Sequence, residues 1–351
     1  MAPGLDVPNG VDACHHDRVT GMGRPQVTCE DAAAELRRGG LIDAALTECV
    51  PLAGGTASRV AALSRPGGPP EAVVKVNEPP QVEAEALFLR TYASAPLLPR
   101  MRVVDRSHRF LVYDYVTGVH VRYGQDRVDT RTAMLTLVHG LLAHYLPADG
   151  PLHPRAAGEV AELLAASGDS DQGTDASTGA PRGAPVGWPE FLGEHVAYRH
   201  ERLAEHLPGE DLRIAERLAR EPRRAESGPL QLIHGDCGAH NFLFDHGRGS
   251  DGSVGDLAAV IDPYPIAGYP IYDLAFAFVS WPNGLDPAAL LPAAEALRES
   301  GRWRPNGDPR RILWEEVLIA LYMRMGTCLA HHPKDLPAYL EAWPRWRALA
   351  T

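Results

Sequence analysis

Residues 232–244 read Leu-Ile-His-Gly-Asp-Cys-Gly-Ala-His-Asn-Phe-Leu-Phe. An apolar strand leads into His-Gly-Asp, a short loop follows, and Asn241 returns the chain to a second apolar strand. Further on, the apolar stretch Ala258–Ile261 ends at Asp262. This pattern predicts a small assembly of strands, at one end of which Asp236, Asn241 and Asp262 converge.

The three converging side chains have the chemistry of a magnesium site. Two carboxylates and an amide oxygen are hard donors, and phosphate oxygens and water can complete the octahedron around Mg²⁺. Phosphoryl transfer uses such a set, because one carboxylate orients and deprotonates the attacking hydroxyl while the other oxygens hold metal. An Asp-x4-Asn pair alone more often caps turns. The preceding His-Gly and the strand-borne Asp262 favour the catalytic interpretation.

The segment resembles the aminoglycoside phosphotransferase and choline kinase family, which are relatives of the protein kinases. Its His-Gly-Asp-x4-Asn and Ile-Asp motifs match the family's, and residues 271–275, Ile-Tyr-Asp-Leu-Ala, match the usual continuation. The resemblance implies that Asp236 is the catalytic base and that Asn241 and Asp262 bind the metal. It also implies that Asp273 is a buried aspartate that supports the catalytic loop.

Lysine is rare in this chain, which makes one lysine informative. Only Lys75 and Lys334 are lysines among 34 basic residues. Lys75 lies in the apolar run Val-Val-Lys-Val, where an unpaired ammonium would be costly. In the family, a lysine on the third strand pairs with a glutamate on the next helix. Glu83 and Glu85 both lie at the start of that helix and point about 200° apart. The family alignment favours Glu85, and Glu83 stays an alternative.

Two further segments are predicted to bind the nucleotide. The turn between the first two strands could line the phosphates with backbone N–H groups, although a Gly-Gly hairpin turn is often only a turn; its residues are Gly54, Gly55, Thr56, Ala57 and Ser58. Residues 110–118 resemble the family's interlobe segment, whose backbone contacts the purine; the residues assigned to it are Tyr113, Tyr115 and Val116. Backbone contacts leave no side-chain code, so ATP and GTP both remain open as donors.

The order of elements predicts an α+β, bilobal, protein-kinase-like fold. Strands are expected over 47–52, 59–63, 72–76 and 109–116, with a helix over 82–92, which gives an antiparallel sheet carrying one helix. A capping box at Thr28 and Asp31 predicts a short helix through Arg38. Later helices are expected over 130–146, 188–207, 211–224 and within 287–349.

The lobes follow from this order. Residues 28–118 are expected to form the nucleotide-binding lobe, and residues 119–351 a larger, mainly helical lobe for catalysis and acceptor binding. Residues 1–27 are expected to be a flexible extension. Residues 167–187 contain no Leu, Ile, Met or aromatic residue, which predicts a flexible insertion.

Composition excludes several function classes. A net charge of −11 argues against nucleic acid or an anionic membrane as the partner and is compatible with a cationic ligand. No apolar run approaches the ~18–20 residues of a membrane span. Five scattered cysteines without a Cys-x-x-Cys motif favour a reducing, cytoplasmic setting.

The predicted function is Mg²⁺-dependent transfer of a nucleotide γ-phosphate to a hydroxyl of a small molecule. An antibiotic acceptor is preferred, such as an aminoglycoside or another sugar or nucleoside natural product, and phosphorylation would give resistance. The alternatives are a metabolic kinase for choline, a methylthio-sugar or homoserine, and a non-catalytic nucleotide-binding module. Acceptor contacts are expected on the later helices, with these candidates: Glu190, Glu194, Tyr198, Trp281, Trp314, Glu315, Glu316, Tyr322 and Asp335.

Overall fold

The computed structural model describes residues 27–52, 58–121, 126–147, 188–220, 229–245, 252–281, 284–331 and 333–350. The predicted insertion over 167–187, the glycine turn over 54–57, and all of the predicted extension except Val27 lie outside the described residues.

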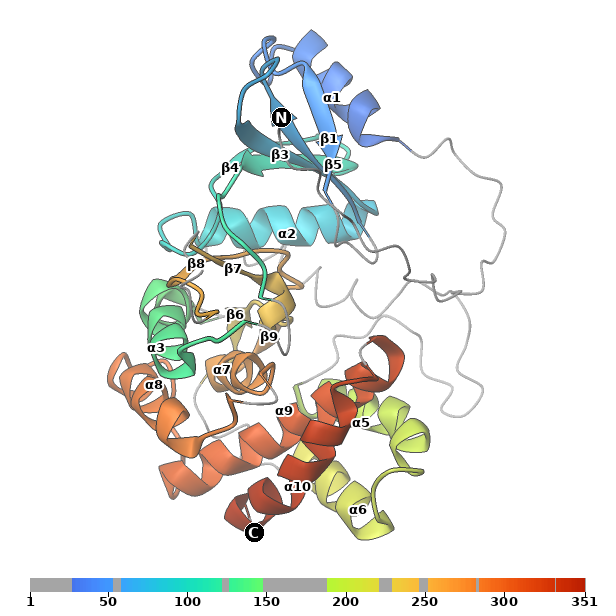
Figure 1. The fold of residues 1–351 in the computed structure, drawn as a ribbon. Helices are drawn as coiled ribbons and strands as arrows, with labels where there is room; N and C mark the ends of the chain where they lie inside the picture. Colours follow the sequence, from blue (N-terminus) through green and yellow to red (C-terminus); the bar gives the residue numbers. More distant parts are fainter. Residues whose placement is uncertain are drawn as a thin grey trace.

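A five-stranded antiparallel sheet forms the N-terminal part of the molecule (Figure 1). Its strands are β1 (Glu48–Pro51), β2 (Arg59–Ser64), β3 (Pro70–Val76), β4 (Met101–Val104) and β5 (Phe110–Asp114), in the spatial order β1-β2-β3-β5-β4. The four predicted strands are confirmed. β4 was not predicted, because four residues with a register shift beside Arg102 carry little alternation.

Two helices cover the two faces of this sheet (Figure 1). α1 (Cys29–Arg38) begins with the predicted capping box between Thr28 and Asp31. It packs on the face that carries Ala72, Val74 and Val112. α2 (Pro79–Thr91) packs on the other face, against Val73, Leu111 and Tyr113. Because side chains alternate along a strand, Lys75 on β3 points to the α2 side together with Val73.

The rest of the chain is mainly helical and contains two short antiparallel ladders, β6–β9 and β7–β8. Its elements are α3 (Thr130–Gly140), η1 (Leu142–His144), α5 (Trp188–Leu203), α6 (Gly209–Arg220), β6 (Gln231–Ile233), η3 (Ala239–Asn241), β7 (Phe242–Phe244), β8 (Leu257–Val260), β9 (Ile266–Gly268), α7 (Pro270–Phe278), α8 (Pro287–Glu299), α9 (Pro309–His331) and α10 (Leu336–Ala350). In Figure 1 the ladders lie between α2 and the later helices.

The predicted helix over 130–146 ends earlier than expected. α3 stops at Gly140, where a Cβ atom would lie 2.5 Å from the Leu97 side chain, and a short 3₁₀ turn follows. Within the described ranges, no helix combines the length and the apolar character that crossing a membrane requires.

Candidate active site

Lys75 lies between two carboxylates. Its Nζ is 2.5 Å from Oε2 of Glu85 on α2, and it also forms an ion pair with Oδ1 of Asp262, which follows β8. Lys75 and Glu85 are only 2% and 3% exposed. The alternative glutamate, Glu83, points outward and lies 3.9 Å from Nδ1 of His108. The structure therefore pairs Lys75 with Glu85, the partner that the family alignment favoured.

Burial and charge act in opposite directions on this cluster. Burial lowers the pKa of the Lys75 ammonium, but Glu85 and Asp262 outweigh burial and raise the pKa above its ordinary value. Burial raises the pKa of Glu85 to about 6 despite the neighbouring Lys75. The ammonium thus stays charged in a buried position, where it can meet the anionic phosphates of a nucleotide.

The loop after β6 is held by one buried carboxylate. Oδ2 of Asp273, on α7, accepts hydrogen bonds from the N–H of His234 at 2.8 Å and from the Tyr145 hydroxyl at 2.8 Å. Its Oδ1 accepts from the N–H of Gly235 at 3.1 Å. These bonds fix the backbone immediately before Asp236, which is the contact that the family resemblance implied for Asp273.

Gly235 is required by the shape of this loop. Its φ is +77°, and a Cβ atom there would lie 2.1 Å from the carbonyl oxygen of Tyr264. The backbone of Tyr264 also donates to the carbonyl of His234 at 2.9 Å. The His-Gly-Asp loop and the segment after Asp262 are therefore in direct backbone contact.

The ring of His234 lies beneath the loop. It is fully buried, its Nε2 lies 3.1 Å from the carbonyl oxygen of Ile261, and Phe88 of α2 packs edge-on against it. Burial lowers the pKa of His234 to about 4, so the neutral ring donates from Nε2 at physiological pH. His234 therefore positions the residue before Asp262 and does not reach the cleft itself.

Asp236 and Asn241 contact each other at the end of β6 and the start of β7. Nδ2 of Asn241 donates to the backbone carbonyl of Asp236 at 2.9 Å and to its Oδ2 at 3.1 Å. The same Oδ2 lies 3.1 Å from Nε2 of His240, a residue that the sequence analysis did not single out. Burial raises the pKa of Asp236, but the hydrogen bonds and charge of His240, with Asn241, outweigh it, and the pKa is lowered overall.

Asp262 is brought to the same place by the β7–β8 ladder. Phe242 pairs with Val260, and the N–H of Ile261 donates to the carbonyl of Asn241 at 2.9 Å. Asp262 itself has a φ of +57°, a left-handed conformation that is strained for a residue with a side chain. Its carboxylate contacts Lys75, so Asp262, Lys75 and Glu85 meet although they come from distant parts of the chain.

The donor set fits a magnesium ion that a nucleotide helps to hold. In the described part of the chain, no group of three His, Cys, Asp or Glu side chains is arranged to bind a metal. Asn241 uses its amide N–H₂ on Asp236, which leaves its carbonyl oxygen as the group for a cation. One amide oxygen and the half-exposed carboxylate of Asp262 are hard ligands that need phosphate oxygens to complete the shell.

The other predicted nucleotide contacts are placed only in part. Gly54, Gly55, Thr56 and Ala57 lie outside the described residues, and Ser58 directly precedes β2. Tyr113 is buried on β5, and the N–H of Tyr115 is already bonded to the carbonyl of Glu71 at 3.2 Å. Within the described ranges the N–H of Val116 has no backbone partner, so Val116 is the better candidate donor to a purine edge.

Most of the acceptor candidates belong to the core. Trp281, Trp314, Glu315, Glu316 and Tyr322 are all buried, and Glu315 pairs with Arg311 at 3.0 Å. Aromatic residues at helical spacing are here packing residues.

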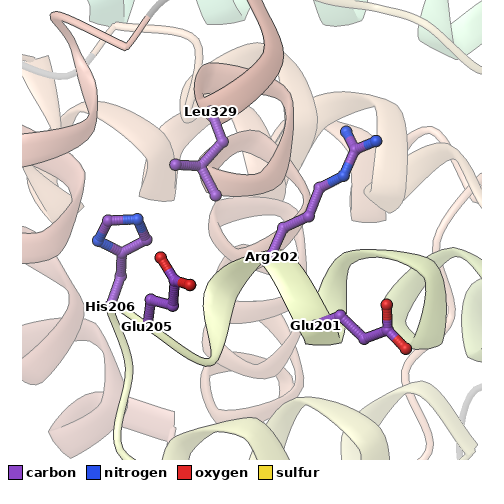
Figure 2. Close-up of a pocket in the computed structure, with 5 residues that line it drawn as sticks. All are labelled: Glu201, Arg202, Glu205, His206 and Leu329. Carbon is purple, nitrogen blue, oxygen red and sulfur yellow. The ribbon is translucent and has the colours of Figure 1, made fainter.

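A hollow of about 450 Å³ lies between the ends of α5 and α9 (Figure 2). It is lined by Glu201, Arg202, Glu205, His206 and Leu329. It lies near the opposite end of α5 from Trp188, whose ring packs against Tyr269 and Tyr272 close to the catalytic loop. Glu201 lies thirteen positions after Trp188, about 20 Å along α5, so the hollow lies at the far end of this helix from Trp188.

The fold and the site together define a small-molecule kinase, which transfers phosphate to an alcohol group. A sequence model described as the phosphotransferase enzyme family matches residues 48–311, more than half of the chain. The protein belongs to this family. No curated protein matches the chain.

Solved structures of several phosphotransferases share the fold. Ethanolamine kinase of Plasmodium vivax has a TM-score of 0.52 and 13% identity, over 86% of this chain and 83% of that one. A mutant aminoglycoside 2′-phosphotransferase-IIIa in complex with GDP has a TM-score of 0.52 and 14% identity, over 91% and 97%. Macrolide 2′-phosphotransferase of Brachybacterium faecium has a TM-score of 0.51 and 19% identity, over 88% and 98%.

Proposed function

We propose that this chain binds a magnesium nucleotide between its sheet and the loop after β6, and that it phosphorylates a hydroxyl of an antibiotic. The observation that carries the proposal is the buried Lys75, which meets Glu85 and Asp262 at once. A buried cation held by one carboxylate of each part of the molecule is suited to bind the phosphates of a nucleotide.

Each polar residue of the site has a role in this proposal. Lys75, held by Glu85, contacts the nucleotide phosphates, and Asn241 and Asp262 hold Mg²⁺. The ion supplies charge neutralisation at the phosphates when it is bound. Asp236 accepts the proton of the acceptor hydroxyl as that oxygen attacks the γ-phosphorus in line. Positioning and electrostatic stabilisation contribute most of the rate.

The nature of the acceptor is supported by two observations. Of the three solved structures described above, two are by name phosphotransferases of an aminoglycoside and of a macrolide. The net charge of −11 is compatible with a basic antibiotic. Phosphorylation adds about two negative charges and removes a hydroxyl donor, which would weaken the binding of a drug to its target.

The proposed setting is the cytoplasm, where nucleoside triphosphates are available. The described cysteines Cys29, Cys49, Cys237 and Cys328 are free thiols, which is compatible with a reducing compartment.

The deciding experiment is a resistance screen. Cells that express the chain are exposed to aminoglycosides, macrolides and nucleoside antibiotics, and any protected compound is analysed by mass spectrometry for one added phosphate. The Asp236→Ala variant is the matched control. Resistance that persists in this variant, or that appears without phosphorylated drug, contradicts the proposal.

A second candidate acceptor is a small amino alcohol, which the likeness to an ethanolamine kinase favours. The purified protein is therefore also incubated with ethanolamine, choline, a methylthio-sugar and homoserine with labelled ATP and labelled GTP. Faster transfer to one of these than to every antibiotic tested would assign a metabolic role.

A further inference from the structure

His240 contacts the proposed catalytic carboxylate directly. It lies in the short turn η3, one residue before Asn241, and its Nε2 is 3.1 Å from Oδ2 of Asp236. An ionised carboxylate can only accept hydrogen bonds, so the proton of this bond is on Nε2 of His240.

The ring of His240 is seated against the backbone. A Cβ atom on Gly238 would lie 2.6 Å from Cε1 and 2.7 Å from Nδ1 of His240, and 3.4 Å from the ring of Phe276. Any larger residue at position 238 would have to displace the ring. The imidazole is still 38% exposed, so one side of the ring is accessible to solvent.

The two oxygens of the Asp236 carboxylate are treated differently. Oδ2 accepts from both His240 and Asn241, each at 3.1 Å. Within the described part of the chain, no protein donor contacts Oδ1. The terminal torsion of an aspartate is broad, so a carboxylate held by one donor can turn either oxygen outward. Two donors on the same oxygen restrict that rotation.

We propose that His240 is a positioning residue for phosphoryl transfer, which holds Oδ2 of Asp236 so that Oδ1 faces the acceptor hydroxyl. The proposal rests on the proposed function of Asp236. In the step, the hydroxyl proton moves to Oδ1 and the hydroxyl oxygen bonds to the γ-phosphorus. The bond from the γ-phosphorus to its bridging oxygen breaks, and the nucleoside diphosphate leaves with that electron pair.

Asn241 alone is less suited to hold the Asp236 carboxylate in one orientation. Its carbonyl oxygen is the group assigned to the metal, so its orientation is set by two tasks at once. His240 is not a proposed metal ligand, so its proposed role in the site is the hydrogen bond to Asp236 alone.

Three variants test the proposal kinetically. His240→Leu removes the donor, His240→Gln keeps an N–H at a similar reach, and His206→Leu removes an exposed histidine from the distant hollow. Rates are measured with the acceptor found in the resistance screen and, with water as the acceptor, as hydrolysis of magnesium ATP.

We expect kcat of His240→Leu to fall by about tenfold to a hundredfold, the range for one charge-assisted hydrogen bond. KM for the nucleotide should stay within about twofold, because His240 acts after nucleotide binding. His240→Gln should recover most of the loss, and His206→Leu should behave like the parent. An unchanged kcat in His240→Leu, or a folded His240→Gln as slow as the leucine variant, overturns the proposal.

A measurement without turnover separates this proposal from the proposed function. Ring nitrogen signals of His240 are recorded by ¹⁵N NMR in the nucleotide-free protein, with His206 as the internal reference. The Asp236→Ala variant should shift the Nε2 signal of His240 and leave that of His206 in place. If the His240 signal does not move, the hydrogen bond is absent and the inference is wrong. If the signal moves but the protein transfers phosphate neither to an acceptor nor to water, the proposed function fails instead.

Discussion

The ammonium of Lys75 forms an ion pair with the carboxylate of Asp262, which lies 187 residues further along the chain. Lys75 belongs to the five-stranded sheet, whereas Asp262 follows a ladder in the mainly helical part. The pair thus joins the two parts of the molecule at the point where the nucleotide is proposed to bind.

Glu85→Gln should weaken the binding of magnesium nucleotide by about tenfold, because Lys75 then loses one of its two charged partners. The free energy of unfolding should also fall, by about 2 kcal/mol, since the glutamate is buried. Calorimetric titration with ATP and GTP and denaturant unfolding measure the two effects. Glu83→Gln is the matched control on the same helix, and it should change neither quantity. Equal losses in both variants would show that Glu85 has no special part.

Asp236→Ala should lower kcat by about a thousandfold and leave nucleotide affinity nearly unchanged, because its carboxylate is proposed to contact the acceptor. Single-turnover kinetics and nucleotide titration make the comparison. Transfer at the rate of the parent would remove Asp236 from the mechanism.

Unlike Asp236→Ala, Asp262→Ala should weaken the binding of magnesium nucleotide, by about a hundredfold, because a proposed metal ligand is lost. The effect should be much smaller for nucleotide measured in the presence of a chelator. The assignment is contradicted if the loss is the same with and without magnesium.

Gly235→Ala should destabilise the protein by about 3 kcal/mol or more, because the added Cβ meets the Tyr264 carbonyl at 2.1 Å. Gly40→Ala provides the control, since Gly40 also has a positive φ, of +65°, but has nothing within 4 Å of its Cβ position. That control should cost only about 1 kcal/mol. Thermal unfolding of the two variants is compared with the parent, and equal midpoints would show that the loop relaxes without cost.

The contribution of His234 to stability should rise with pH between about 4 and 6.5, whereas the raised pKa values of Asp273, about 7, and Glu85, about 6, act in the opposite direction. The folded pKa of about 4 is below the ordinary histidine value of 6.5, so in this window the unfolded state binds a proton that the folded state does not. This contribution is fully present above pH 6.5 and is lost as the pH falls through 4. It amounts to about 3 kcal/mol at most.

The test is urea unfolding of the parent and of His234→Gln across this range. The glutamine keeps a donor for the Ile261 carbonyl but cannot titrate, so the parent should lose more stability on acidification than the variant. The buried His195, whose pKa burial also lowers to about 4, is present in both proteins, so its contribution to the pH dependence of stability cancels in the comparison. Parallel pH curves would contradict the prediction.

The sheet was predictable because strands and helix starts depend on local patterns, whereas the pairing of Lys75 with Glu85 was implied by the resemblance to the family. Alternation defined the strands, the capping box defined the start of α1, and the rarity of lysine drew attention to Lys75. The choice between Glu83 and Glu85 was open from the residues alone, because both lie near the start of one helix and only packing decides which faces inward.

Other features depend on tertiary contacts that leave little trace in a sequence. The approach of Leu97 to Gly140, which leaves no room for a side chain at position 140, is one of them. The contact between His240 and Asp236 depends on the space over Gly238. A histidine four residues after Asp236, with a glycine two residues before that histidine, is the only sequence signal of that arrangement.

The helix that carries Glu85 is anchored to both parts of the molecule at once. Val82 and Leu89 pack with the sheet, whereas Phe88 packs against His234 and the Tyr92 hydroxyl donates to the Leu232 carbonyl at 2.7 Å. Swinging α2 outward would strip apolar surface from two cores and break the support beneath the catalytic loop. The Lys75–Glu85 pair is therefore preassembled, and switching the enzyme off by displacement of this helix would cost the packing of both cores.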